Sequence, residues 1–280
     1  MDKTKSLRIY FSISCHEAVS DAIISSYLVK KNFKSFNIFT KLTITKKSTL
    51  NQSINYENYF DEISEAFIPK IDLRLKKYFH QNIGSIRLFN SIIQSGKKAK
   101  EKNFDFIIYL NSGSWIIDSK KILKVLKLMS SKQYLFGSRV QTFLNGKAIY
   151  FDDHFLIVNL KAKSLQNPFN IPYNSRAYLP IDFYYGGIHK NLFSWYSMFP
   201  KNSLYIYSDL GNSYDEYGNI GARFIPLSWD CNNFLLHSNS RYGNVFPLRK
   251  KYLTLIKFDI DDDNIKDIIE SWSDTWKYKI

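Results

Sequence analysis

Short apolar runs alternate with amphipathic stretches through the first part of the chain. The run from Leu7 to Ser14 is rich in aromatic and β-branched residues, and apolar positions then recur at helical spacing between His16 and Lys31. A second apolar run follows from Phe36 to Leu42. This strand–helix–strand order predicts two parallel strands joined by a right-handed crossover.

A polar segment separates this unit from the next periodic stretch. Between Thr43 and Gly84 no period is sustained, which predicts loop with short helices at Tyr56–Ala66 and Leu73–Phe79. From Ile86 the helical period returns, although Gly96 weakens it.

The clearest local signal is a buried strand that runs into a small polar turn and then a helix. The strand FDFIIYL (Phe104–Leu110) is followed by the turn NSGS (Asn111–Ser114) and a helix over Ser119–Met129, which Asp118 or Ser119 can cap. A further short strand is predicted at Gln133–Ser138.

The second half of the chain is less regular. It predicts strands at Lys147–Asn159, Leu204–Ser208 and Arg223–Leu227, and helices at Asn191–Phe199 and Asp263–Lys277. Together these elements predict an α/β fold with a central mixed sheet flanked by helices. Open sheets of this class bind ligands at the carboxyl ends of their strands.

Composition narrows the class of protein. A chain of 280 residues that is 45% hydrophobic can bury a full core, and no run of about 18 uncharged apolar residues is present. The amino terminus passes from a short basic stretch directly into a strand, so we expect a cytoplasmic chain without a signal peptide. Cys15 and Cys231 lie far apart in apolar stretches, which predicts buried thiols rather than a disulfide or a zinc site.

The formal net charge of +14 indicates an anionic partner. Nucleic acid, anionic lipid and negatively charged small substrates all fit it, and a general bias toward lysine explains part of the excess.

Two segments resemble a known family. The run GSIRLFNSIIQSGKKAKEKNFDFIIYLNSGSWIIDSKKI (Gly84–Ile122) and the opening FSISCHE (Phe11–Glu17) are similar to core-2/I-branching-type glycosyltransferases and their bacterial polysaccharide relatives. The resemblance implies a GT-A fold, a nucleotide-sugar donor, inversion at the anomeric carbon and no divalent metal. It further implies a donor-binding half at residues 1–140 and an acceptor-binding, catalytic half at residues 141–280, within one continuous domain.

The turn after the central strand lacks the acids that would hold a metal. Mg²⁺ or Mn²⁺ against a diphosphate needs carboxylate oxygens at the strand end, whereas the NSGS turn offers neutral groups that can bind a sugar or ribose. The alternative is that the turn only connects strand and helix. The predicted donor-binding residues are Ser14, His16, Glu17, Arg87, Asn111, Ser112, Gly113 and Ser114.

Without a metal, a leaving diphosphate needs Arg or Lys to neutralise its charge. The resemblance implies a clamp toward the carboxyl terminus, and Arg241, Arg249 and Lys250 fit it by their order in the chain. Arg87 and Arg139, near predicted strand ends, are second choices.

An inverting transfer also needs a general base near the acceptor hydroxyl. The candidates are Asp215 and Glu216 in a segment that also has the composition of a surface turn, Asp153 at a strand start, and His189 before an apolar helix.

Aromatic faces that pack against sugars complete the predicted site. Tyr184, Tyr185, Trp195 and Trp229 are the candidates for binding a glycan or lipid-linked glycan acceptor.

Two acidic runs could suggest a metal site, but each is interpreted here without a metal. The run Asp261–Asp263 directly precedes a predicted helix and is interpreted as its cap. Asp152 and Asp153, beside His154, are adjacent on a strand and should point to opposite faces, which argues against one shared ion.

Two hypotheses from different classes follow. The first is a metal-independent glycosyltransferase of bacterial surface polysaccharide or lipooligosaccharide synthesis, resting on the anionic inner face of the inner membrane. The second is a basic nucleic-acid-binding protein, for which no helix-turn-helix, zinc-finger or RNA-recognition signature is present in the sequence. A catalytically inactive relative of the enzyme is a third possibility.

Overall fold

The computed structural model describes residues 7–15, 19–67, 83–116, 118–143, 148–164, 166–171, 188–209, 227–229, 235–238 and 260–271. Within these ranges a seven-stranded sheet has the order β3-β2-β1-β4-β7-β6-β8, and a three-stranded sheet has the order β5-β10-β9. The strands of the large sheet are β1 (Arg8–Cys15), β2 (Asn37–Ile44), β3 (Glu62–Glu65), β4 (Phe106–Asn111), β6 (Phe136–Phe143), β7 (Ala148–Asn159) and β8 (Leu204–Asp209). The small sheet contains β5 (Ser114–Ile116), β9 (Leu227–Trp229) and β10 (Leu235–Ser238).

The large sheet is mixed because one strand runs against the others. The pairs β1–β2, β1–β4, β2–β3 and β6–β8 are parallel, whereas β7 is antiparallel to both β4 and β6. Strands β1 to β4 and β6 therefore end at the same edge, and β7 begins there. We call this edge the carboxyl edge.

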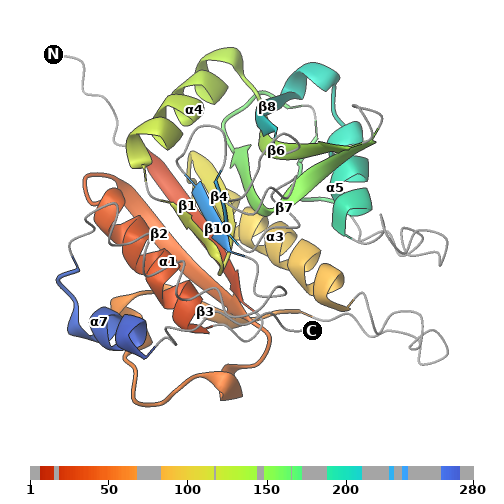
Figure 1. Ribbon diagram of the computed structural model, residues 1–280. Coiled ribbons are helices and arrows are strands. Elements are labelled where there is room, and N and C mark those ends of the chain that lie inside the picture. Colours follow the sequence, from red (N-terminus) through yellow and green to blue (C-terminus); the bar gives the residue numbers. More distant parts are fainter. Residues whose placement is uncertain are drawn as a thin grey trace, which may run out of the picture.

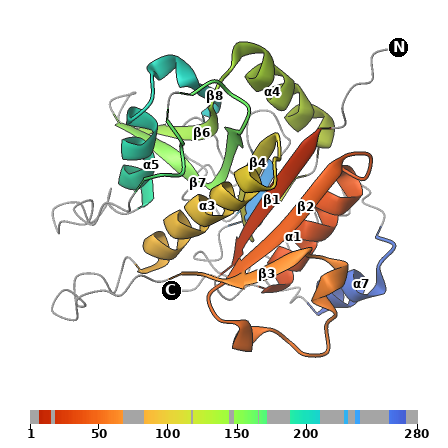
Figure 2. The same ribbon diagram turned by 180° about the vertical axis from the view of Figure 1, so that it is seen from behind.

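Helices cover both faces of the large sheet. They are α1 (Val19–Asn32), α3 (Ile83–Glu101), α4 (Ser119–Lys132), α5 (Ile188–Ser197) and α7 (Asp263–Glu270), with 3₁₀ turns η1 (Lys47–Thr49), η2 (Tyr56–Asn58) and η6 (Lys201–Ser203). One core cluster joins the sheet to α1 and α4, and a second joins its other face to α3 and α5. Helix α1 lies in front of the sheet in Figure 1, and α3 lies in front in the reverse view of Figure 2. This arrangement confirms the predicted α/β class with a central mixed sheet flanked by helices.

Most predicted elements are present with shifted ends. The parallel β1–α1–β2 unit is confirmed, and Asp118 caps α4 by accepting a hydrogen bond from the Lys121 backbone at 3.1 Å. The short helix predicted at Tyr56–Ala66 is wrong beyond its first turn, because η2 gives way to β3. That strand was missed because it has only four residues and lies at the sheet edge.

Strand β10 was not predicted, and the segments predicted at Leu73–Phe79 and Arg223–Pro226 lie outside the described residues. Strand β6 (Phe136–Phe143) spans residue 140, where the two predicted halves meet.

Gly96 lies at a close contact of α3. A Cβ atom built on it would lie 2.1 Å from the Phe169 ring, and Phe169 is fully buried in the α3–α5 cluster. The glycine that weakens the helical pattern therefore allows this packing. Glycine lowers the helix propensity at this position, but it lets the Phe169 ring pack directly against the backbone of α3.

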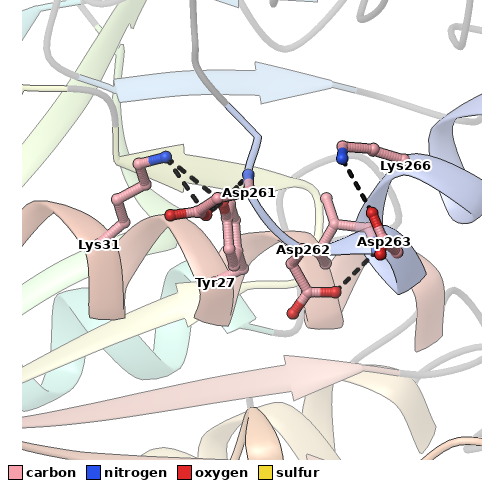
Figure 3. A network of polar contacts seen from close by, with 7 residues as sticks. Tyr27, Lys31, Asp261, Asp262, Asp263 and Lys266 are labelled. Atoms are coloured by element: carbon pink, nitrogen blue, oxygen red, sulfur yellow. Dashed lines mark hydrogen bonds and ion pairs between the residues drawn. The ribbon is translucent and has the colours of Figure 1, made fainter.

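The acidic run before α7 ties the carboxyl-terminal helix to α1 (Figure 3). Asp262 is the N-cap, accepting a hydrogen bond from the Ile265 backbone at 3.1 Å, and it also accepts one from the Tyr59 hydroxyl. Asp261 contacts Tyr27 and Lys31 of α1. These contacts confirm the interpretation of the run as a cap.

Candidate functional site

Polar side chains form a row across the carboxyl edge. Ser14 of β1 is in register with Asn111 of β4 on one side and with Thr43 of β2 on the other, and Thr43 is in register with Ser64 of β3. Residues in register on parallel strands point to the same face, and Ser14 faces α3. The row Asn111–Ser14–Thr43–Ser64 therefore lies on the α3 face, at the end where such sheets bind ligands.

Helix α3 contacts this face through serines one turn apart. The hydroxyls of Ser12 and Ser95 lie 2.9 Å apart, and those of Ser14 and Ser91 lie 3.0 Å apart. Both helix serines are buried, which lets the helix approach β1 closely. Arg87 lies one further turn toward the start of α3, so the same helix face carries it to the carboxyl edge.

The NSGS turn is held by its own polar groups. Asn111 Oδ1 accepts a hydrogen bond from the Gly113 backbone at 3.2 Å, and the Ser112 backbone donates to Ser14 O at 2.8 Å. Ser112 and Ser114 are buried, whereas Asn111 is partly exposed. The turn is thus a structural connection that presents Asn111 at the edge.

The small sheet brings the carboxyl-terminal part of the chain to this turn. Strand β10 pairs with β5, and His237 is in register with Ser114. In the sequence, Arg241 follows the end of β10 by three residues.

Buried polar atoms lie on the elements around Ser14. Thr43 Oγ1 on β2 and Arg87 Nε on α3 have no hydrogen-bond partner among the described residues, and the buried Tyr109 hydroxyl on β4 neighbours that of Ser14. Burial raises the pKa of Tyr109 above its ordinary value, the charge of Asp153 raises it further, and the neighbouring Ser14 hydroxyl lowers it. A buried polar group without a partner costs about 1–3 kcal/mol, so such groups mark strain or a ligand site.

A charged cluster lies midway along β7, level with the carboxyl end of β4, where Leu110 pairs with Phe155. The prediction that Asp153 lies at a strand start is therefore wrong, since β7 begins at Ala148. Arg139 of β6 is buried and donates from Nε to Asp152 Oδ2 at 2.6 Å. His154 Nδ1 lies 3.0 Å from Asp152 Oδ1 and 3.4 Å from Asp153 Oδ1. Burial lowers the pKa of His154, but the charges of Asp153 and Asp152 outweigh it, and the pKa is raised.

This cluster corrects the strand argument of the sequence analysis. One ligand atom from each of Asp152, Asp153 and His154 lies within 4.8 Å of the others, so adjacent residues do converge here. The ladder of β6 with β7 shifts register between Ser138 and Val140, and strict alternation fails beside that shift. However, the Arg139 guanidinium is already paired with Asp152, so one carboxylate that a metal would need is held by a protein cation. The donor set therefore fits a metal poorly.

The β4–β7 ladder brings the two parts of the edge together. Leu110 of β4 pairs with Phe155 of β7, so Asn111 and His154 are the next residues along these antiparallel strands. The polar row and the charged cluster are therefore neighbours, which brings together predicted donor-binding residues and one predicted base.

Trp195 is a wrong prediction. It is fully buried, its indole nitrogen donates to Pro168 O at 2.6 Å, and its ring packs against Phe89 and Phe136. It therefore offers no face to an acceptor. Its place in an amphipathic helix is equally typical of a core residue.

Several predicted residues lie outside the described part of the chain. These are His16, Glu17, Tyr184, Tyr185, Asp215, Glu216, Arg241, Arg249 and Lys250. His189 and Trp229 lie in α5 and β9, and their side chains are outside the description too. Cys15 is buried, as expected, and Cys231 is not described.

The sequence analysis missed Thr43, Ser64, Ser91 and Tyr109 as site residues. A usable signal existed for Thr43, because it is a polar residue near the end of the second apolar run, as Ser14 is near the end of the first. Ser91 carries no signal of its own, since its role depends on how α3 packs.

The sequence matches no protein-family model and no curated protein. Among solved structures, it is similar to a proposed nucleotide-diphospho-sugar transferase from Desulfovibrio desulfuricans G20 at 6% identity and a TM-score of 0.36, over 68% of this chain and 75% of that one. It is similar to the galactosyltransferase LgtC bound to donor and acceptor sugar analogues at 14% identity and a TM-score of 0.33, over 55% and 58% of the two chains.

A third similar structure is S. aureus TarS 1–349, at 10% identity and a TM-score of 0.32, over 51% of this chain and 38% of that one. The chain thus covers less than two thirds of LgtC and of TarS 1–349. With all three TM-scores below 0.5, these likenesses carry no weight for the activity. In the part of the chain that is described, no helix combines the length and the apolar character needed to cross a bilayer.

Proposed function

We propose that the chain is a glycosyltransferase that moves a sugar from a nucleotide-sugar donor to a glycan or lipid-linked glycan acceptor. The observation that carries the proposal is the pairing of Ser14 with Asn111 at the carboxyl edge, with the cluster of Asp152, Asp153 and His154 on the neighbouring strand β7. Hydroxyl and carboxamide groups suit sugar and ribose hydroxyls, and a nearby carboxylate suits proton removal from an acceptor.

Of the four predicted bases, Asp153 is the one whose side-chain position the structure describes, and it lies at this edge. It is 17% exposed and lies beside the raised-pKa His154. In an inverting transfer, the Asp153 carboxylate takes the proton of the acceptor hydroxyl as that oxygen attacks the anomeric carbon. The bond to the diphosphate breaks in the same step, and its electron pair leaves on the phosphate oxygen.

The proposal extends to a mechanism without a metal. Asn111 and Ser14 are neutral, and Arg139 holds Asp152 in a buried ion pair. The positive charge that stabilises the leaving diphosphate would then come from basic side chains of the chain itself. The excess of Lys and Arg over Asp and Glu, 39 against 25, supplies such side chains.

The cellular setting is part of the same proposal. A net charge of +14 suits a chain that acts in the cytoplasm at an anionic inner-membrane surface, where lipid-linked glycans of a surface polysaccharide or lipooligosaccharide would be extended. Exposed lysines of α4, including Lys120, Lys124 and Lys127, are one such basic face.

The test is a screen of nucleotide sugars for thermal stabilisation in EDTA, followed by product analysis with the donor that stabilises most. We expect one nucleotide class to raise the melting temperature and to be released during turnover. No stabilisation by any nucleotide sugar, together with tight oligonucleotide binding, would support the nucleic-acid hypothesis instead. A strict Mn²⁺ requirement would contradict the metal-free mechanism.

A further inference from the structure

The contacts of α3 with β1 step regularly toward the carboxyl edge. From Ser95 to Ser91 the helix advances about 6 Å, and from Ser12 to Ser14 the strand advances about 6.6 Å, so successive contacts match. One further turn of α3 brings Arg87 about 6 Å beyond Ser14, past Cys15 at the end of β1. The helix thus carries a guanidinium group to the open end of the sheet.

Arg87 has no ion-pair partner among the described residues. Its Nε is buried without a hydrogen bond, while the side chain as a whole is only partly buried. By contrast, Arg139 is fully buried and paired with Asp152. The guanidinium group of Arg87 is attached to a helix and has at least one N–H group, Nε, that makes no hydrogen bond to the described residues. The planar fork of N–H donors in such a group can bind two oxygens of an oxyanion at once.

Hydroxyl groups lie on the α3 face of the strands next to this position. Ser14 is partly exposed and in register with Thr43, whose buried Oγ1 has no hydrogen-bond partner among the described residues. Hydroxyl donors and a guanidinium are complementary to phosphate oxygens, whereas an apolar ligand would leave all of them unsatisfied.

We propose that Arg87, with the Ser14 and Thr43 hydroxyls, forms a diphosphate-binding site on the α3 side of the carboxyl edge. The site accepts the diphosphate of the donor and neutralises it as it leaves, and in this role it rests on the proposed function. The residues predicted from the sequence for this task were mainly Arg241, Arg249 and Lys250, near the carboxyl terminus. Arg87 supplies the charge from the amino-terminal half.

The probe is inorganic pyrophosphate, titrated by calorimetry into the full chain in EDTA at constant ionic strength. We expect saturable binding that R87Q weakens about tenfold or more, because a charge-assisted hydrogen bond is lost. R87K should recover part of the affinity, since it keeps the charge but not the fork. T43V, which keeps the shape but removes the hydroxyl, should weaken binding about threefold to tenfold.

The matched control is Arg8, at the opposite end of β1. It donates to Asn103 O and stacks on Phe104, away from the carboxyl edge. R8Q changes the net charge as R87Q does, so equal losses in both variants would reduce the effect to general electrostatics and overturn the site. Thermal unfolding checks that each variant folds. If R87Q does not fold, R87K and T43V decide the question.

The outcomes separate this site from the proposed function. Pyrophosphate binding that depends on Arg87, without binding or turnover of any nucleotide sugar, would leave the site standing and remove the glycosyltransferase. Conversely, R87Q could turn over a nucleotide sugar with an unchanged donor KM and an unchanged pyrophosphate affinity. That result would support the glycosyltransferase and overturn the Arg87 site. A wild-type chain that does not bind pyrophosphate overturns the inference.

Discussion

The hydroxyls of Ser14 and Ser91 lie 3.0 Å apart and join the end of β1 to α3. One turn along the helix, Ser95 makes the equivalent contact with Ser12 at 2.9 Å. The two pairs have the same chemistry but differ in position, because only Ser14 lies in the polar row at the carboxyl edge.

This difference predicts unequal effects of two matched substitutions. S91A and S95A should each lower the free energy of unfolding by about 1–2 kcal/mol, since each leaves the facing hydroxyl, that of the partly buried Ser14 or of the buried Ser12, with one partner fewer. Only S91A should weaken donor binding, because it frees Ser14 at the site. Denaturant unfolding and calorimetry with the stabilising nucleotide sugar measure the two effects. Equal donor affinities in both variants would show that Ser14 is purely structural.

Asp153 gives a second prediction, on catalysis. D153N keeps the size of the side chain but removes the base, so turnover should fall by about 10²–10⁴-fold while donor affinity changes little. Steady-state kinetics and donor calorimetry separate these quantities. D61N serves as a control, because Asp61 accepts from Thr40 on the α1 side of the sheet and takes no part in the proposed chemistry. Full turnover in D153N would return the role of base to Asp215, Glu216 or His189.

The sheet could be predicted from sequence further than the site could. Strand β1 and helix α1 carry their own periodicity, and Asp118 carries a capping signal, so local pattern was sufficient. Strands β3 and β10 are only four residues long, and β3 lies at the sheet edge. Whether such short segments form strands depends on hydrogen bonding to a neighbouring strand more than on their own hydrophobic pattern.

The site residues likewise fall into those that a local pattern predicts and those that depend on packing. Ser14 and Asn111 end apolar strands, and parallel pairing then places them in register without further information. Ser91 and Tyr109 matter only through the packing of α3 against the sheet, which buries both side chains and which no local pattern reports. Trp195 fails for the opposite reason, because an aromatic side chain in a helix has the same sequence signal in a core and in a binding site.

Gly96 gives a third prediction, on stability. Helix propensity alone would make G96A stabilising by up to about 1 kcal/mol, but its Cβ would lie 2.1 Å from the buried Phe169 ring. We therefore expect a loss of about 1–3 kcal/mol in the free energy of unfolding. G137A is the comparison, since its Cβ would meet the Met129 sulfur at 2.7 Å and a flexible thioether can move aside. A larger loss in G137A than in G96A would contradict the packing around Phe169.

The pH dependence of stability should report the charged cluster. His154 has a raised pKa because Asp153 and Asp152 favour its protonated form against burial. A raised pKa means that the folded chain binds the proton more tightly than the unfolded chain does. This stabilisation is therefore fully present below the ordinary histidine pKa of about 6.5 and is lost as the pH rises through the raised value.

H154Q removes the titration while keeping a polar side chain of similar length. Denaturant unfolding at pH values from 5.5 to about 9 should show the wild type losing stability relative to H154Q as the pH rises above about 6.5. A proton NMR titration of the histidine signals, with the His154 signal identified by its absence in H154Q, should place its midpoint above that value. D153N should bring the midpoint down, because it removes the charge that raises the pKa most. A midpoint that does not move in D153N would mean that His154 and Asp153 are not coupled, and the proposed base would then act independently of the other charged groups midway along β7.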